Sequence, residues 1–153
     1  MTRSLAITAL LSAACATADA PPALDLNAPL NTPFTVEIGH SAVLTEPAVT
    51  ITFTAVPQDS RCPVDAVCIW AGDAVVALTL HVGPPDGDGP DVKAELHTNL
   101  EPRSTPWGPY YELQLLDLQP VPRLHPPPSE PYRATLVMES RSGRCCGDGP
   151  EVR

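Results

Sequence analysis

The sequence predicts an all-β fold, either an antiparallel β-sandwich or a small barrel, with about six or seven strands and Pro-rich loops. Hydrophobic and polar residues alternate along several short segments, which is the pattern of half-buried strands. Twenty of the 153 residues are proline, and they are so dispersed that no interval suits a long helix. The length fits one domain, and a hydrophobic content of 43% is sufficient for a core.

The predicted sandwich occupies residues 33–140. In residues 49–54, β-branched and aromatic residues alternate with threonines, which is typical of a strand with one wet face. Residues 74–97 form a predicted hairpin around a turn rich in glycine and proline. Six prolines within residues 119–131 cannot donate ladder hydrogen bonds, so this segment is expected outside the sheet. The remaining predicted strands are residues 34–38, 111–118 and 132–138.

Residues 1–14 are interpreted as a signal peptide. Arg3 supplies a positive start, and ten residues without charge follow at positions 5–14. Ten helical residues rise only about 15 Å, which is half of a bilayer core. This segment is therefore expected to direct export rather than to span a membrane.

The end of this segment, Leu11-Ser12-Ala13-Ala14-Cys15, resembles the lipobox of bacterial lipoproteins. The resemblance implies that Cys15 carries lipid and that the lipid attaches the protein to a membrane. The sequence departs from the family at Ser12, where the family has a large aliphatic residue. Ala16, a residue other than aspartate, implies delivery to the outer membrane by resemblance to Gram-negative lipoproteins. The expected location is the cell envelope, as an outer-membrane or periplasmic lipoprotein with residues 15–32 as a tether. Soluble secretion with cleavage after Ala18 is the alternative.

Export favours disulfides among the other four cysteines, which allow three pairings. The pair Cys62–Cys68 is favoured because five intervening residues, one of them proline, close a compact loop. Cys145 and Cys146 lie in residues 141–153, which are predicted to be a flexible tail. Adjacent Cα atoms are about 3.8 Å apart, so a bridge between these two would be strained. They remain candidates for a second disulfide or for a thiol site.

Residues 59–72 are predicted to form a stapled connection between two strands. Pro63 starts the turn, and Gly72 lets the chain re-enter the sheet where a side chain would clash. Trp70 is expected to lie against the sulfurs or to cap the core. Asp59 and Arg61 are expected to hold the entrance of the loop through hydrogen bonds or an ion pair.

This segment, an acidic-Ser-Arg-Cys-Pro stretch followed by four residues and Cys-x-Trp-x-Gly, is similar to one in a group of small exported bacterial proteins. Many members of that group are lipoproteins, and they are uncharacterised β-domains. The resemblance implies an exported β-domain. It implies no chemistry.

Charge and motif content restrict the possible functions. The net charge of −9, with Lys93 as the single lysine, argues against binding to nucleic acid or to an anionic membrane surface. Neither a Gly-x-Ser-x-Gly turn nor a phosphate-binding glycine loop is present. His81 and His97 share a face of the predicted hairpin, but simple pairing sets them opposite Lys93 and Ala77, too far apart for one metal ion. We therefore expect no enzyme activity, no metal and no cofactor.

A non-catalytic envelope module, accessory or binding, is the function favoured by these observations. Trp107 and Tyr110 form a possible aromatic binding platform for a protein or small-ligand partner. One alternative is a metal-binding or thiol-redox module at Cys145 and Cys146. The other is a secreted enzyme or enzyme inhibitor that acts through an exposed loop, including the stapled one.

Overall fold

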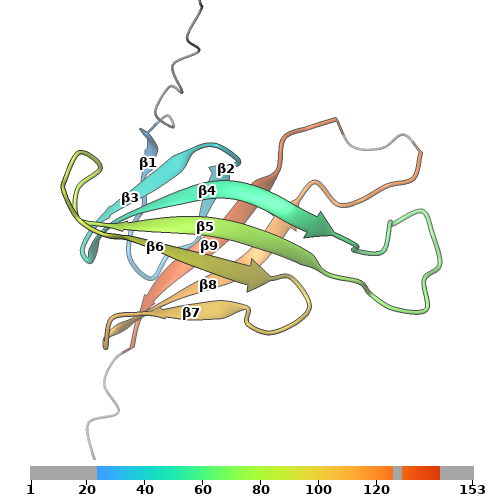
Figure 1. Ribbon diagram of the computed structural model, residues 1–153. Coiled ribbons are helices and arrows are strands. Elements are labelled where there is room, and N and C mark those ends of the chain that lie inside the picture. The colour runs from blue at the N-terminus through green and yellow to red at the C-terminus, as the bar shows by residue number, and fades with distance from the viewer. Residues whose placement is uncertain (1–23, 126–128, 142–153) are drawn as a thin grey trace, which may run out of the picture.

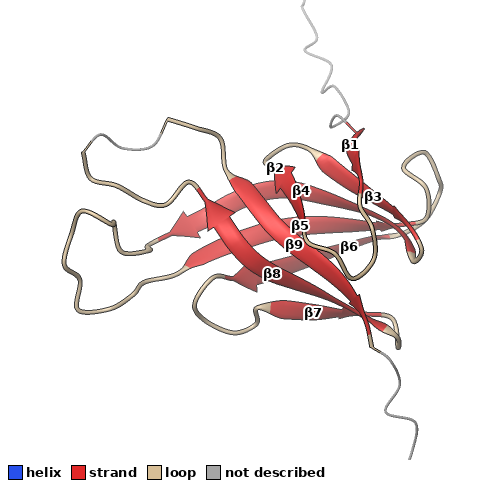
Figure 2. Ribbon diagram, turned by 180° about the vertical axis from the view of Figure 1, so that it is seen from behind, coloured by secondary structure: helices blue, strands red, loops and turns tan. Residues whose placement is uncertain are grey.

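The computed structural model describes residues 24–125 and 129–141, which fold into nine strands without a helix. Two sheets pack face to face without closing into a barrel, so the predicted β-sandwich is confirmed (Figures 1 and 2). Among these residues no helix could cross a bilayer. The strands are β1 (Leu24–Asn27), β2 (Phe34–Glu37), β3 (Ser41–Thr45), β4 (Ala48–Asp59), β5 (Ala74–Val82), β6 (Asp91–His97), β7 (Ser104–Trp107), β8 (Tyr111–Gln119) and β9 (Arg133–Ser140).

The first sheet has the order β1-β3-β4-β5-β6, and the second has the order β2-β9-β8-β7. All neighbouring strands are antiparallel except β1 and β3, which are parallel. The longest strand, β4, is central in the first sheet and shows the predicted alternation, with Val49, Ile51 and Phe53 fully buried. These side chains join the core between the sheets, which also includes Leu78, Leu113, Leu136 and Met138.

Three strands lie where the sequence pattern predicts none. β3 and β7 are short, and β7 contains Pro106 at a sheet edge, where a missing N–H is tolerated. β1 lies inside residues 15–32, which the sequence analysis interprets as a tether. The interpretation is wrong for the later part of that range, because Ala28 is buried and its N–H donates to Val43 O at 2.9 Å.

The hairpin β5–β6 is confirmed, but its register differs by two residues from simple pairing. His81 lies opposite Asp91, and His97 lies opposite Val75. The turn is therefore shorter than simple pairing implies, because Asp91 already pairs within β6. The imidazoles of His81 and His97 hydrogen-bond to Asp91 and Asp73, respectively, so each has its own carboxylate partner.

Three connections gather at one end of the sandwich, on the right in Figure 1. They are the β4–β5 loop, the β6–β7 loop and the β8–β9 loop. The predicted connection at residues 59–72 is the first of these. The described part of the Pro-rich segment beyond β8, residues 120–125 and 129–131, lies in the third, outside the ladder as expected.

Candidate functional site

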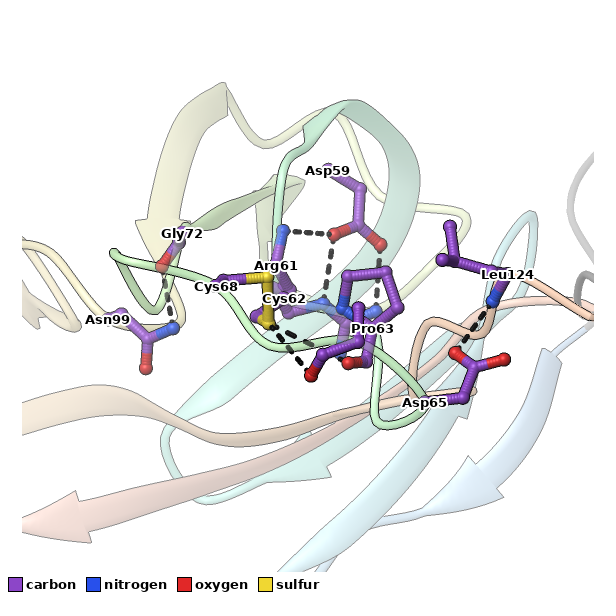
Figure 3. Close-up of a disulfide and its surroundings, with 10 residues drawn as sticks. Asp59, Arg61, Cys62, Pro63, Asp65, Cys68, Gly72, Asn99 and Leu124 are labelled. Carbon is purple, nitrogen blue, oxygen red and sulfur yellow. Dashed lines mark hydrogen bonds and ion pairs between the residues drawn. A yellow bond between two sulfur atoms is a disulfide. The ribbon is translucent and has the colours of Figure 1, made fainter.

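The β4–β5 connection, residues 60–73, is closed by a disulfide between Cys62 and Cys68, so the predicted pairing is confirmed. Their Cα atoms are 6.0 Å apart, a usual distance for a bridge. Between the end of β4 and the disulfide, the loop continues the β4–β5 ladder. Ser60 N–H donates to Asp73 O at 2.7 Å, and Cys62 N–H donates to Ala71 O at 2.8 Å. We call residues 60–73 the stapled loop (Figure 3).

Gly72 is required by the close approach of the two arms of the stapled loop. Its φ is +68°, and a Cβ atom at this position would lie 1.8 Å from Ser60 O. Any other residue would combine a left-handed backbone with a collision against main chain. The predicted role of this glycine is therefore confirmed.

Arg61 connects the stapled loop to the opposite sheet. Its guanidinium donates to both carboxylate oxygens of Asp59, at 3.0 and 2.8 Å. It also donates to the carbonyl oxygens of Leu118, at the end of β8, and of Pro120. Tyr132 completes the cluster through its hydroxyl, which donates to Asp59 at 3.1 Å. The expected Asp59–Arg61 pair thus holds three chain segments together.

The ionisation of this cluster follows from its contacts. Burial alone would raise the pKa of Asp59, but the hydrogen bonds and positive charge of Arg61 outweigh it and lower this pKa below its usual value. Burial and the adjacent Asp59 charge raise the pKa of Tyr132. The carboxylate is therefore ionised and fully engaged, which fits bracing rather than acid–base chemistry.

Asp73 joins the stapled loop to the β6–β7 loop. It is 5% exposed and accepts hydrogen bonds from the Asn99 N–H at 2.9 Å and the Thr98 hydroxyl at 3.1 Å, with His97 on its second oxygen. Burial by itself would raise the pKa of Asp73, but these hydrogen bonds lower it to about 2. The Asn99 amide also donates to Gly72 O, so the root of the stapled loop is held on this side too.

Asp65 joins the stapled loop to the β8–β9 loop. Its carboxylate accepts the N–H groups of Leu124 and His125 at 2.8 and 3.0 Å, and the Leu124 bond is the largest cause of its lowered pKa. Nearby, Val64 N–H donates to Pro122 O at 3.0 Å. The stapled loop is thus fixed from both neighbouring loops.

Beyond these contacts the loop exposes hydrophobic side chains. Val67, Ile69 and Trp70 are 103%, 92% and 82% exposed, and we call residues 66–71 the apolar tip. The exposure of Trp70 contradicts the expectation that it caps the core. Of the eleven large hydrophobic residues that are exposed among the described ones, seven lie in these three loops: Val64, Val67, Ile69, Trp70, Leu100, Val121 and Leu124.

The predicted aromatic platform lies elsewhere. Trp107, in β7, packs partly buried against the core, whereas Tyr110 is 66% exposed in the turn before β8. The pair is at the opposite end of the sandwich from the apolar tip (Figure 1). Of the two residues, only Tyr110 is exposed.

Other predicted site residues fall outside the described ranges. These are Cys15, Cys145 and Cys146. Within residues 24–125 and 129–141, no three or more His, Cys, Asp or Glu side chains are grouped so that they could hold a metal ion.

The apolar tip was not predicted as an exposed surface. One signal could have revealed it: positions 66–72 contain no charged residue, although they follow a predicted turn and precede a strand. No family model, curated protein or solved structure matches this chain.

Proposed function

We propose that this protein is an exported, lipid-anchored, non-catalytic module of the bacterial envelope that binds its target through the apolar tip of the stapled loop. The observation that carries the proposal is the near-complete exposure of Val67, Ile69 and Trp70 on a loop braced from both sides. Single exposed hydrophobic residues are common, but a cluster of them marks an interaction surface.

The bracing supports a binding role because it reduces the entropy lost on association. The disulfide joins residues six positions apart. By restricting the unfolded chain, it stabilises the folded state by about 2 kcal/mol in the chain-entropy account. Asp65 and Asp73 then fix the loop to its two neighbours. A loop ordered before binding need not be ordered by the target, and tryptophan is enriched among the residues that dominate binding energies.

The non-catalytic part of the proposal is supported by the hydrogen bonding of the acids around the loop. Asp59 and Asp73 are the carboxylates most closely surrounded by hydrogen-bond donors at this end, and each is engaged by structural partners. A general acid or base needs a group that can exchange a proton near neutral pH. The lowered pKa of Asp59 and of Asp73 is opposite to that requirement.

Export and anchoring are tested by the intact mass of the mature protein, measured with and without reductant. A chain that begins at Cys15 with added acyl mass and gains two hydrogens on reduction of the Cys62–Cys68 bridge supports the proposal. A chain that retains its first 14 residues, or that begins after Ala18 without lipid, contradicts the anchoring.

Binding through the tip is tested by photocrosslinking in the bacterium that produces the protein. Trp70 is replaced by benzoylphenylalanine, and the matched control carries the same replacement at Leu116, which is 40% exposed on β8. Adducts formed only from position 70 are expected. Equal adducts from both positions, or none from position 70, would contradict binding through the tip.

A further inference from the structure

We propose that the target of the apolar tip is the bilayer itself: Val67, Ile69 and Trp70 enter the interface of an uncharged lipid surface beside the protein's own lipid anchor. The inference rests on the proposed lipid-anchored function and identifies what the tip binds. It makes the domain a two-point membrane attachment, with lipid at Cys15 and a rigid loop at the end of the sandwich.

The chemistry of the tip fits the interfacial region of a bilayer. Seven consecutive residues, 66–72, carry no charge. Trp70 combines a large apolar ring with an indole N–H, and such side chains concentrate at membrane–water interfaces. Neither Ile69 nor Trp70 makes a hydrogen bond to any residue that the structure describes, so their polar groups are available to lipid headgroups and water.

The same hydrogen-bonding facts limit the depth of insertion. Non-helical backbone with free polar groups is excluded from the hydrocarbon core when lipid surrounds it. The tip backbone is not part of the ladder, which ends at the Cys62–Ala71 hydrogen bond. The side chains therefore reach the headgroup and upper acyl region, while the backbone stays in the hydrated layer.

The length of chain before β1 brings the tip to the membrane. Nine peptide steps separate Cys15 from Leu24, and they reach at most about 30 Å. Leu24 is level with Ser41, which is level with Thr52, ten residues before Cys62, where the ladder ends. Ten strand residues span about 33 Å. A nearly extended linker therefore reaches about as far along the sandwich as the base of the tip, so the anchor and the tip can touch one surface.

Charge selects the kind of surface. The protein has a net charge of −9, which repels an anionic bilayer. The carboxylate next to the tip in sequence, Asp65, accepts hydrogen bonds from two backbone N–H groups of the β8–β9 loop. A zwitterionic surface therefore fits the uncharged tip, whereas pairing of two tips in a dimer would bring two molecules of the same charge together.

A protein pocket is the less favoured target. The three large side chains of the tip are almost wholly exposed. A bilayer accommodates exposed apolar side chains without a complementary pocket. It also remains within reach of an anchored domain at all times, which raises its effective concentration above that of a free partner.

The direct test reads the environment of Trp70 in the lipidated full chain reconstituted in phosphatidylcholine vesicles. The chain has two tryptophans, so Trp107→Phe leaves Trp70 as the single reporter. We expect a blue-shifted emission and at least twofold quenching when brominated phosphatidylcholine replaces the ordinary lipid. The matched control, Trp70→Phe, retains only Trp107 and is expected to show little quenching. Should Trp107→Phe fail to fold, the difference between the natural chain and Trp70→Phe gives the same readout.

A second test measures partition of the purified full chain onto vesicles by flotation. Replacing Val67, Ile69 and Trp70 together by serine is expected to weaken partition by at least about tenfold, because the apolar area buried in the interface is lost. The control replaces Val92 and Leu116, which are 46% and 40% exposed elsewhere, and is expected to leave partition unchanged. For the unlipidated chain, partition is expected to be stronger on phosphatidylcholine than on phosphatidylglycerol at low salt.

The outcomes separate this inference from the proposed function. Lipidated protein that floats with vesicles but shows no quenching of Trp70 overturns the inference and leaves the anchoring intact. If the mature chain carries no lipid, anchoring fails. The inference then stands only if the unanchored chain still shows Trp70-dependent partition at high lipid concentration. A preference for phosphatidylglycerol, or tip-dependent dimers without quenching, would also overturn it.

Discussion

Replacement of Arg61 by methionine tests whether the Asp59–Arg61 pair holds the two sheets together at the loop end. Methionine keeps an apolar stem of similar length but removes the charge and every guanidinium hydrogen bond. Asp59 would then lose its cation, and the carbonyl groups of Leu118 and Pro120 would lose their donor.

The magnitude follows from burial. The side chains of Arg61 and Asp59 are 11% and 14% exposed, so their pair is part-buried and lies between surface and fully buried ion pairs. Removal of one partner costs about 3–5 kcal/mol in a fully buried pair and under about 1 kcal/mol at the surface. We expect Arg61→Met to lower the free energy of unfolding by an intermediate amount, about 1–3 kcal/mol.

The assay is urea unfolding followed by far-ultraviolet circular dichroism, with free energies extrapolated to water. Arg133→Met is the matched control: its ion pair with Glu37 joins side chains that are 44% and 37% exposed, and loss of such a pair costs under about 1 kcal/mol. The double variant Asp59→Asn with Arg61→Met should lose less than the sum of the two single variants, because neither charge then remains alone.

Equal destabilisation by Arg61→Met and Arg133→Met would refute this reasoning. So would strict additivity of the two changes at Asp59 and Arg61, because it would mean that the pair does not act as one unit.

Two further predictions concern the root of the stapled loop. The pKa of Asp73 falls from 3.8 to about 2 on folding, so its contribution is present above pH 4 and is lost as the pH falls toward 2. The lost free energy of unfolding is about 2 kcal/mol and is measured from the urea midpoint as a function of pH. Asp73→Asn should flatten this pH dependence between pH 4 and pH 2. An unchanged pH dependence in the variant would contradict the role of Asp73. Gly72→Ala should destabilise by more than the roughly 1–2 kcal/mol of a left-handed backbone, because the new Cβ meets Ser60 O. Gly39→Ala supplies the comparison, since Gly39 also has a positive φ (+84°) but nothing lies within 4 Å of its Cβ position; similar losses for both variants would argue against the close contact.

The core strands could be predicted because their signal is local. In β4, the buried Val49, Ile51 and Phe53 alternate with threonines, and period two follows directly from strand geometry. β1 gave no such signal, since it has four residues and its pairing with β3 comes from distant main chain. β7 was hidden by Pro106, which is compatible with a strand only at an edge.

The candidate site was predictable in part for the same reason. The disulfide and the Asp59–Arg61 pair join residues close in sequence, so spacing alone pointed to both. The partners of Asp73 are about 25 residues further along the chain, and those of Asp65 are about 60 residues further. No local pattern contains such contacts, and the direction of Trp70 depends on them.

By itself, the sequence determined the fold class, the closed loop and the need for glycine at position 72, because hydrophobic alternation, loop closure and backbone freedom act over a few residues. Only the tertiary structure decided that three loops meet at one end and that the apolar tip is left outside the core. The packing of two sheets sets which loops become neighbours, and the braces supplied by Asp65 and Asp73 from those neighbours hold the loop with Trp70 facing solvent.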